Sequence, residues 1–265
     1  MINKLNNILE KLFPPVSKRW YLFSITHIYI KNIYRIFFQF NRITPNLLFN
    51  KDFHQSSKRI RDNEKWESLT KAHLGCGDVY LTSYINVDMP LEANAMSDYH
   101  GMKVDKRAYL HDLNIFKDSS LDVIEMYHVF EHIKPWRVKE VMQEIIRVLK
   151  PGGELVIECP DIFKCAMNYL IDSSNHKIST MGIYGDSKYE LESNMHYAGY
   201  SQETLFKILN NYGFDKSHIF TIPARRWKIR DLQIVAFKKG IDRKLARKHA
   251  MERLIADTVN LYQLK

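Results

Sequence analysis

A glycine loop followed by a carboxylate is the stretch of this sequence best suited to chemistry. Residues 72–78 read AHLGCGD, which indicates the end of a buried strand and a tight loop, and residues 84–88 read YINVD, a second strand that ends on Asp88. Glycine lets a backbone approach a ligand that any Cβ would block, and an acid ending the next strand can accept hydrogen bonds from both hydroxyls of a ribose. Because Gly-x-Gly turns also occur where no ligand binds, the loop alone leaves its role open.

Three later segments follow the loop in a specific order. They are residues 111–114 (HDLN), 121–133 (LDVIEMYHVFEHI) and 141–162 (VMQEIIRVLKPGGELVIECPDI). In order and spacing these blocks resemble the class I S-adenosylmethionine-dependent methyltransferases, in particular a bacterial type with LGCG, INVD, HDL, HVFEH and LKPGG motifs. The resemblance covers roughly residues 71–240. It implies S-adenosylmethionine as the cofactor and an α/β fold, a Rossmann-like doubly wound sheet of about seven strands whose last strand is antiparallel.

Hydrophobic patterns predict the elements that would position these motifs. The run 121–127 is mostly apolar, as in a strand buried on both faces, and residues 138–149 carry apolar side chains at helical spacing. Only about nine residues separate Asp78 from Asp88, so no more than one helical turn fits between the first two strands. We predict strands at 71–74, 85–87, 109–113, 121–127, 154–159, 218–223 and 232–238, and helices at 135–150, 163–171, 202–212 and 242–261.

The resemblance assigns the cofactor to residues at the ends of the strands. It implies that Asp88 binds the ribose hydroxyls, that Asp112 lies near the adenine amino group, and that Asp78 meets the ammonium group of the methionine part. Cys76 is interpreted as a small filler of the loop, and His128, directly after the fourth strand, as a contact to the cofactor or the substrate. The full predicted set is Gly75, Cys76, Gly77, Asp78, Asp88, Asp112, Leu113 and His128.

Methyl transfer from a sulfonium is an in-line displacement, so the enzyme must position the acceptor and, for a hydroxyl, remove a proton. We predict His196 as the base, because a histidine can accept a proton near neutral pH and the resemblance places its block, NMHYAG, over the site. Asp161, just beyond the fifth strand, is predicted to orient the acceptor, and Glu131 is interpreted as mainly structural. We assign no metal ligands, although a paired Asp and His holding a divalent cation stays an alternative.

The charge of the chain is unevenly distributed. Residues 1–65 carry 12 Lys or Arg against 4 Asp or Glu, and residues 225–265 also carry 12 against 4, so the net charge of +9 leaves −7 for residues 66–224. An acidic core with basic ends is not expected of a nucleic-acid enzyme, whose basic surface lines the substrate groove. The basic ends fit an anionic membrane surface or an acidic partner, or are simply solvated. Three cysteines without metal-ligand spacing favour a reducing compartment.

The first 65 residues are predicted to form a basic, aromatic-rich helical extension. Residues 17–40 keep their polar side chains on one stripe of a helix, and their longest uncharged run is too short to span a membrane. This helix would pack on the catalytic domain or on a second subunit of a homodimer, or lie in the membrane interface. We predict a methyltransferase domain at 66–240, with an insertion at 162–200 over the active site, and a basic C-terminal helix at 241–265.

The bacterial type that these motifs resemble is linked to surface-polysaccharide and glycolipid assembly, which suggests O-methylation of a sugar hydroxyl. We therefore predict a cytoplasmic enzyme, or one peripheral at the inner face of the cell membrane, that methylates a surface glycan or its lipid- or nucleotide-linked precursor. A small metabolite as the acceptor, and a cofactor-binding module without catalysis, stay as alternatives. An NAD-dependent oxidoreductase would want a G-x-G-x-x-G run, and residues 75–80 lack the third glycine.

Overall fold

The computed structural model describes residues 68–90, 101, 103–186, 191–222, 224, 227 and 230–261, with the side chains of the last helix described as far as Arg253. These residues belong to one compact unit, Ser57–Lys265. The predicted extension at 1–65, with its helix at 17–40, lies outside the described residues. No helix in the described part of the chain is long and apolar enough to cross a membrane. The predicted domain boundaries after residues 65 and 240 stay predictions.

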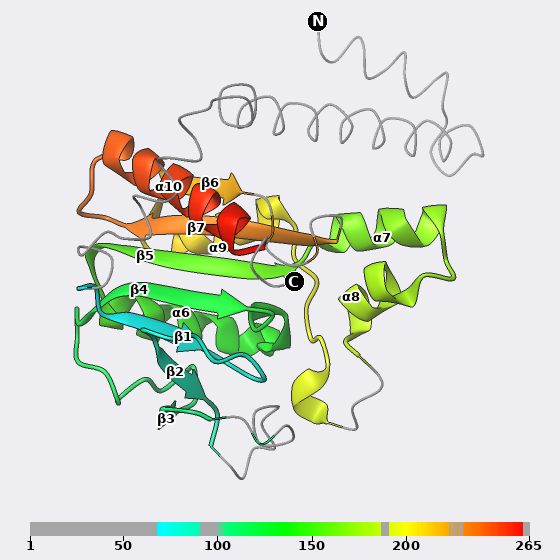
Figure 1. Cartoon of the computed structure of the whole chain (residues 1–265), viewed down its shortest axis with the longest axis horizontal. Coiled ribbons are helices and arrows are strands. Elements are labelled where there is room, and N and C mark those ends of the chain that lie inside the picture. The colour runs from blue at the N-terminus through cyan, green and yellow to red at the C-terminus, as the bar shows by residue number, and fades with distance from the viewer. Residues whose placement is uncertain are drawn as a thin grey trace, which may run out of the picture. The chain divides into compact units, whose positions relative to one another are not determined.

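In the described part of the chain, seven strands form one sheet (Figure 1). They are β1 (Lys71–Leu74), β2 (Ile85–Asp88), β3 (Lys106–Arg107), β4 (Leu121–Tyr127), β5 (Leu149–Pro160), β6 (Phe214–Ile222) and β7 (Asp231–Lys238). Their order is β3-β2-β1-β4-β5-β7-β6, with β7 antiparallel to both of its neighbours and the other pairs parallel. The predicted Rossmann-like doubly wound sheet is confirmed. The strand order reverses at β1 and β4, so a ligand crevice is expected at their carboxyl ends.

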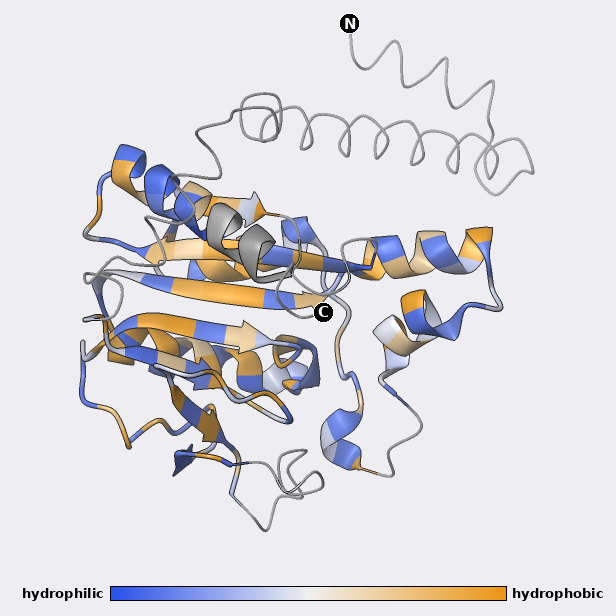
Figure 2. Cartoon of the chain, in the orientation of Figure 1, coloured by the Kyte–Doolittle hydropathy of each residue, from blue (hydrophilic) through white to orange (hydrophobic). Residues whose placement is uncertain are grey.

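Helices supply much of the core that packs against the sheet. The described α-helices are α6 (Val138–Val148), α7 (Ile162–Ile171), α8 (Thr180–Tyr184), α9 (Gln202–Asn211) and α10 (Arg243–Leu261), with 3₁₀ turns at 130–132, 135–137, 176–178 and 192–194. α6 buries Val141, Met142 and Ile145, and α9 buries Leu205 and Leu209 in the same apolar cluster. Figure 2 shows hydrophobic residues dominating β4 and β5. The insertion at 162–200 contains two α-helices, α7, which we predicted at 163–171, and α8, which we did not predict.

The third strand does not lie where the sequence predicted it. We expected a strand at 109–113, but only residues 106–107 pair with β2. Asp105 explains the shift, because its Oδ2 accepts hydrogen bonds from the Asn86 backbone at 2.9 Å and from the Asn86 side chain at 3.1 Å. These bonds bring the chain alongside β2 early, and it turns away at 109–112.

A buried ion-pair cluster ties the last helix to the sheet. Arg253 of α10 donates from Nε to Glu154 Oε1 at 2.5 Å and from Nη1 to Glu125 Oε1 at 2.6 Å, and all three side chains are more than nine-tenths buried. Tyr84 also donates to Glu125 Oε1, at 2.6 Å. Buried carboxylates need such partners, because removing one member of a buried pair leaves an uncompensated charge. At least one basic residue of the C-terminal helix therefore stabilises the fold.

Arg253→Met should destabilise the protein strongly, because it leaves Glu125 and Glu154 buried without their cation. We expect the free energy of unfolding, measured in urea, to fall by about 3–5 kcal/mol. Lys248→Met is a control on the same helix: its ion pair with Glu252 lies at the surface, so the loss should stay below about 1 kcal/mol. Equal losses in the two variants would contradict a structural role of the cluster.

Candidate active site

Backbone hydrogen bonds hold the glycine loop at the carboxyl end of β1. Gly75 N and Cys76 N both donate to Val87 O, at 2.8 and 3.0 Å. Gly75 has a φ of +67°, and a Cβ on it would stand 2.6 Å from Val129 Cγ2, so the position requires glycine. The loop therefore packs directly against the segment that follows β4.

Asp88 ends β2, as predicted, and its side chain faces the loop. Its Oδ2 accepts a hydrogen bond from Gly77 N at 3.1 Å, and its Oδ1 accepts one from Met89 N at 2.8 Å. The residue is buried. A carboxylate oxygen has about two lone-pair sites, so each oxygen of Asp88 can accept one more hydrogen bond. Two ribose hydroxyls would need that capacity.

The other predicted cofactor residues differ in their surroundings. Burial raises the pKa of the Cys76 thiol to about 12, which fits a filler of the loop and leaves no thiolate near neutral pH. Asp78 is exposed on the loop. Asp112 is exposed in the turn beyond β3 and not at a strand end, because β3 ends earlier than we predicted. Leu113 is fully buried, and its N–H already donates to Glu144 Oε2 at 2.7 Å.

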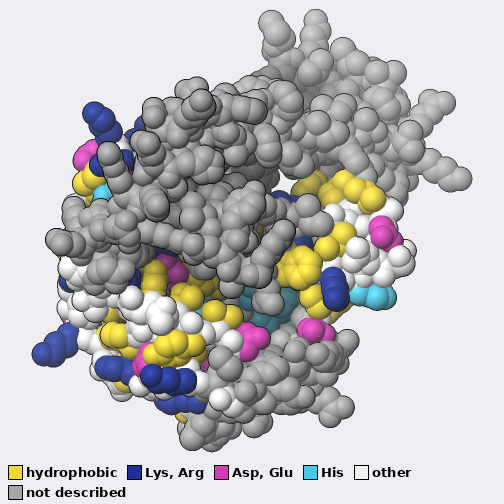
Figure 3. All heavy atoms as spheres, viewed as in Figure 1, with side chains coloured by type: hydrophobic (Ala, Val, Ile, Leu, Met, Phe, Trp, Pro, Cys, Tyr) yellow, Lys and Arg dark blue, Asp and Glu magenta, His cyan; other side chains and the backbone are white. Residues whose placement is uncertain are grey.

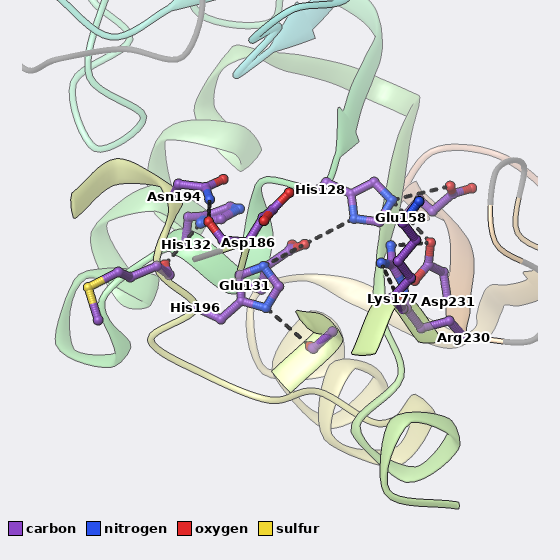
Figure 4. A network of polar contacts seen from close by, with 12 residues as sticks. His128, Glu131, His132, Glu158, Lys177, Asp186, Asn194, His196, Arg230 and Asp231 are labelled. Atoms are coloured by element: carbon purple, nitrogen blue, oxygen red, sulfur yellow. Dashed lines mark hydrogen bonds and ion pairs between the residues drawn. The ribbon is translucent and has the colours of Figure 1, made fainter. Parts of the chain in front are cut away.

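His128 follows β4 in an uncommon backbone conformation, with a φ of +55°. Its ring lies between two carboxylates: Nδ1 is 3.2 Å from Glu131 Oε1, and Nε2 is 3.1 Å from Asp231 Oδ2 (Figure 4). Both nitrogens therefore carry protons. Burial opposes the charge, but the hydrogen bonds to Asp231 and Glu131 outweigh it and raise the pKa of His128 to about 10. His128 is thus a cation that joins the end of β4 to the start of β7.

Asp231 belongs to this network and was missed by the sequence analysis. It is fully buried, and Arg230 donates to its Oδ1 from Nε at 2.6 Å and to its Oδ2 from Nη2 at 3.1 Å. Because β7 is antiparallel, its first residue lies opposite Pro160, at the edge where β4 and β5 end. The role of Asp231 could have been predicted from the antiparallel last strand, because an acid at the start of that strand lies at the edge of the sheet where β4 and β5 end.

His196 lies where the insertion covers the end of β4. Its Nδ1 is 3.1 Å from Gly182 O, and its Nε2 is 3.9 Å from Glu131 Oε1 (Figure 4). Burial lowers the pKa of His196 to about 4, so the ring is neutral near pH 7. The ring packs edge-on against His132, with centroids 4.7 Å apart. In the space-filling view, histidine side chains are visible in a recess beside hydrophobic residues (Figure 3).

Glu131 connects these groups, although the sequence analysis interpreted it as mainly structural. Its backbone O accepts hydrogen bonds from Tyr197 N at 2.9 Å and Ala198 N at 3.3 Å, which fixes the insertion on the segment after β4. Its side chain is buried between His128 and His196. Burial alone would raise the pKa of Glu131, but its bond to His128 lowers that pKa to about 2. The carboxylate is therefore charged at neutral pH.

Asp161 uses its side chain to begin α7. Its Oδ1 accepts a hydrogen bond from Phe163 N at 3.0 Å, the arrangement of a helix N-cap. Its backbone N donates to Arg230 O at 3.0 Å, and the residue forms a bridge with Tyr200. These contacts give Asp161 a structural role, and the orientation of an acceptor by Asp161 stays a prediction.

Residues 72–157 match the family model Methyltransf_11, described as a methyltransferase domain. Over these residues the chain is similar to a methyltransferase domain. The match covers about a third of the chain and includes the glycine loop, Asp88 and the segment after β4, whereas Asp161 and His196 follow it in sequence. A search of curated proteins found no match.

Solved structures similar to the chain include several methyltransferases. An S-adenosylmethionine-dependent methyltransferase from Archaeoglobus fulgidus is 16% identical, with 77% of this chain and 99% of that chain covered and a TM-score of 0.43. One from Methanosarcina mazei is 17% identical, with 65% and 93% covered and a TM-score of 0.46. An O-methyltransferase family protein from Burkholderia thailandensis is 13% identical, with 71% and 57% covered and a TM-score of 0.45. At such low identity, the similarity concerns the fold alone.

The match to a methyltransferase domain implies S-adenosylmethionine as the cofactor. The residues present fit it, because Asp88 can still accept hydrogen bonds from a ribose, and Gly75 and Gly77, both at positive φ, expose backbone at the crevice. When bound, the cofactor supplies an electrophilic methyl group on a sulfonium. Both ring nitrogens of His128 are engaged by carboxylates, so a direct contact of His128 to the cofactor stays a prediction.

Gly75→Ala should weaken the binding of S-adenosylmethionine, because the new methyl group would stand 2.6 Å from Val129 and displace the loop. Gly101→Ala is the matched control: its φ of +63° imposes a similar backbone cost, but nothing lies within 4 Å of the added Cβ. We expect the Kd from isothermal titration to rise by about tenfold or more, or about 1.4 kcal/mol, in Gly75→Ala alone. Unchanged affinity in that variant would contradict a loop positioned by Val129.

The charged His128 should make stability fall as the pH rises. Its folded pKa of about 10 lies above its ordinary value of 6.5, so the folded state keeps a proton that the unfolded state releases. Its contribution is complete below about pH 6.5 and disappears as the pH rises to about 10. The difference in unfolding free energy between wild type and His128→Gln, measured in urea, should therefore shrink across this range. His176→Gln, at an exposed ring, should keep the wild-type slope; a pH-independent difference for His128→Gln would contradict the charge assignment.

Proposed function

We propose that the chain is an S-adenosylmethionine-dependent O-methyltransferase whose acceptor is a sugar hydroxyl of a bacterial surface glycan, or of its lipid- or nucleotide-linked precursor. The resemblance of the LGCG, INVD, HVFEH and LKPGG blocks to enzymes of surface-polysaccharide assembly supports the acceptor class. The convergence of proton-accepting side chains after β4 supports a hydroxyl as the acceptor group.

The observation that carries the proposal is the convergence of Glu131, His132 and His196. One ligand atom from each residue lies within 4.8 Å of those of the other two. Glu131 and His132 belong to the short segment after β4 whose Val129 packs against Gly75 of the glycine loop. A sugar hydroxyl is neutral and becomes a strong nucleophile only when it loses its proton. Side chains that accept protons or bind cations are what such an acceptor requires.

His196 has a lone pair for proton transfer at Nε2, because Nδ1 must donate to the carbonyl of Gly182. A ring with a pKa of about 4 is a weak base by itself. The Glu131 carboxylate, 3.9 Å from Nε2, would stabilise the imidazolium that forms when the hydroxyl proton moves to this nitrogen. The role of His196 as the base is part of the proposal.

The proposal also includes peripheral contact of the basic ends with the inner face of the cell membrane. Residues 1–65 and 225–265 each have an excess of 8 positive charges, which suits anionic lipid headgroups beside a lipid-linked acceptor. Burial of Arg230 and Arg253 withdraws two of these positive charges from any such surface. Sedimentation with anionic vesicles would test the membrane contact. A protein that binds the vesicles sediments only when they are present, whereas a homodimer without membrane contact sediments equally with and without them.

His196→Ala should keep cofactor binding and lose methyl transfer, whereas Asp88→Ala should lose both. Binding is measured by isothermal titration with S-adenosylmethionine, and transfer by the labelled methyl group that reaches nucleotide-linked and lipid-linked sugars. We expect the rate of His196→Ala to fall by about 10²–10⁴, the usual contribution of a general base. We expect the cofactor affinity of Asp88→Ala to fall by about tenfold or more, which corresponds to about 1.4 kcal/mol.

His176→Ala is the control for these variants, because its ring lies in the same insertion but is exposed. Transfer to a small metabolite and to no glycan would replace the proposed acceptor class. Normal cofactor binding without transfer to any acceptor would leave a cofactor-binding module. Full activity of His196→Ala would exclude this histidine from the reaction.

A further inference from the structure

Two histidines close to the Glu131 carboxylate are bonded through Nδ1 to backbone carbonyls. His132 Nδ1 is 2.9 Å from Met195 O, and His196 Nδ1 is 3.1 Å from Gly182 O. A carbonyl oxygen can only accept a hydrogen bond, so Nδ1 carries the proton in both rings. In a neutral imidazole the other nitrogen then has the lone pair. Each histidine therefore presents Nε2 as an acceptor or a metal ligand.

The carboxylate of Glu131 completes this arrangement. Its Oε1 is bonded to His128, and its Oε2 is buried without a hydrogen-bond partner among the described residues. A buried charged oxygen without a partner is costly. One ligand atom each from Glu131, His132 and His196 lies within 4.8 Å of the others, so three groups that can bind a cation converge on one place.

We propose that Glu131, His132 and His196 bind a divalent transition-metal ion, with Zn²⁺ as the first choice. Two imidazole nitrogens and one carboxylate oxygen form a ligand set that suits Zn²⁺ and related ions, whereas Mg²⁺ and Ca²⁺ prefer oxygen ligands alone. Three protein ligands leave coordination positions open, as in catalytic zinc sites. An acceptor hydroxyl could occupy one of these positions.

The contacts around the three residues are those expected of a metal site. Metal-binding histidines usually donate their second ring N–H to a carbonyl or a carboxylate, and ligating carboxylates are themselves hydrogen-bonded. Here the carbonyls of Met195 and Gly182 fix the two rings, and His128 fixes Glu131 through Oε1 (Figure 4). The ligand atoms are therefore oriented before any ion binds.

A second group with similar side chains does not support a metal site. His128, Glu158 and Asp231 also have ligand atoms within 4.8 Å of one another. However, both nitrogens of His128 face carboxylates, and Arg230 pairs with both oxygens of Asp231. This group already contains its own cations, so a metal ion would have to displace them.

The metal inference concerns the same site as the proposed function and keeps its acceptor but not its base. Its acceptor step rests on that function, although metal binding can be tested by itself. If a metal ion binds, the Nε2 lone pair of His196 is a ligand and cannot also accept the hydroxyl proton. A hydroxyl bound to the metal would be more acidic, as water is on Zn²⁺. Loss of activity on chelation would then replace the assignment of His196 as the base.

The test is cobalt and zinc binding to the full chain after treatment with a chelator. Co²⁺ reports its ligands through visible absorption bands, and Zn²⁺ binding is measured by isothermal titration. We expect one ion per chain, with affinity reduced by about tenfold or more in Glu131→Gln, His132→Ala and His196→Ala, which corresponds to about 1.4 kcal/mol or more for each ligand. His176→Ala, which removes an exposed histidine of the same insertion, should bind like wild type.

Circular dichroism of each variant separates loss of a ligand from loss of the fold. If wild type binds neither ion, or if the double variant His132→Ala/His196→Ala is folded and binds as well as wild type, the metal site is excluded. Metal binding that depends on these residues, in a protein that methylates no acceptor, would leave the site intact and overturn the proposed function instead.

Discussion

The burial of the Glu131 carboxylate is the constraint on which the rest of the site depends. A charged group removed from water must be compensated by a cation or by hydrogen bonds. His128 supplies the cation from a left-handed backbone conformation, and its ring contacts Glu131 on one side and Asp231 on the other. One histidine thereby connects the carboxylate after β4 to the first residue of β7. Backbone strain of this kind is retained where the surroundings determine the conformation.

The backbone of Glu131 also sets the position of the insertion. Its carbonyl accepts hydrogen bonds from Tyr197 and Ala198, which lie directly after His196. Within the insertion, Gly185 forms an antiparallel β-bridge with Met195, and Gly185 has a φ of +93°. The position of His196 therefore depends on contacts made by residues close to it and not on its own side chain alone. On the cofactor side, Val129 links the same segment to the glycine loop.

Local patterns explain which parts of the fold could be predicted. β1 and β4 have the predicted bounds, because each is a buried run with a clear beginning and end. The predicted position of the third strand was wrong. β3 has only two residues, its place depends on the hydrogen bonds between Asp105 and Asn86, and no apolar run marks it in the sequence. The same error placed Asp112 at a strand end, whereas it lies in the turn beyond β3.

The site divides in the same way between local and long-range information. Asp88 was predictable because a motif and a strand end determine its place. The contact of Glu131 with His196 could not be predicted, because it joins residues far apart in the sequence and no local pattern records it. Asp161 shows the reverse case, since a residue chosen for its position after β5 is engaged as a helix cap.

Two clusters at this edge contain the same kinds of side chains but differ in where their protons are. In the first, both nitrogens of His128 face carboxylates, so the ring is a cation and the acids have partners. In the second, His132 and His196 donate hydrogen bonds from Nδ1 to backbone carbonyls, so each neutral ring keeps its lone pair at Nε2. A neutral histidine has one proton, and a carbonyl on one side of the ring therefore determines what the other side can bind. His128 compensates Glu131 through Oε1, whereas Oε2 has no hydrogen-bond partner among the described residues and is the oxygen that we propose for the acceptor's proton or a metal ion. Because His196 has a single lone pair at Nε2, the two roles exclude each other at any one moment.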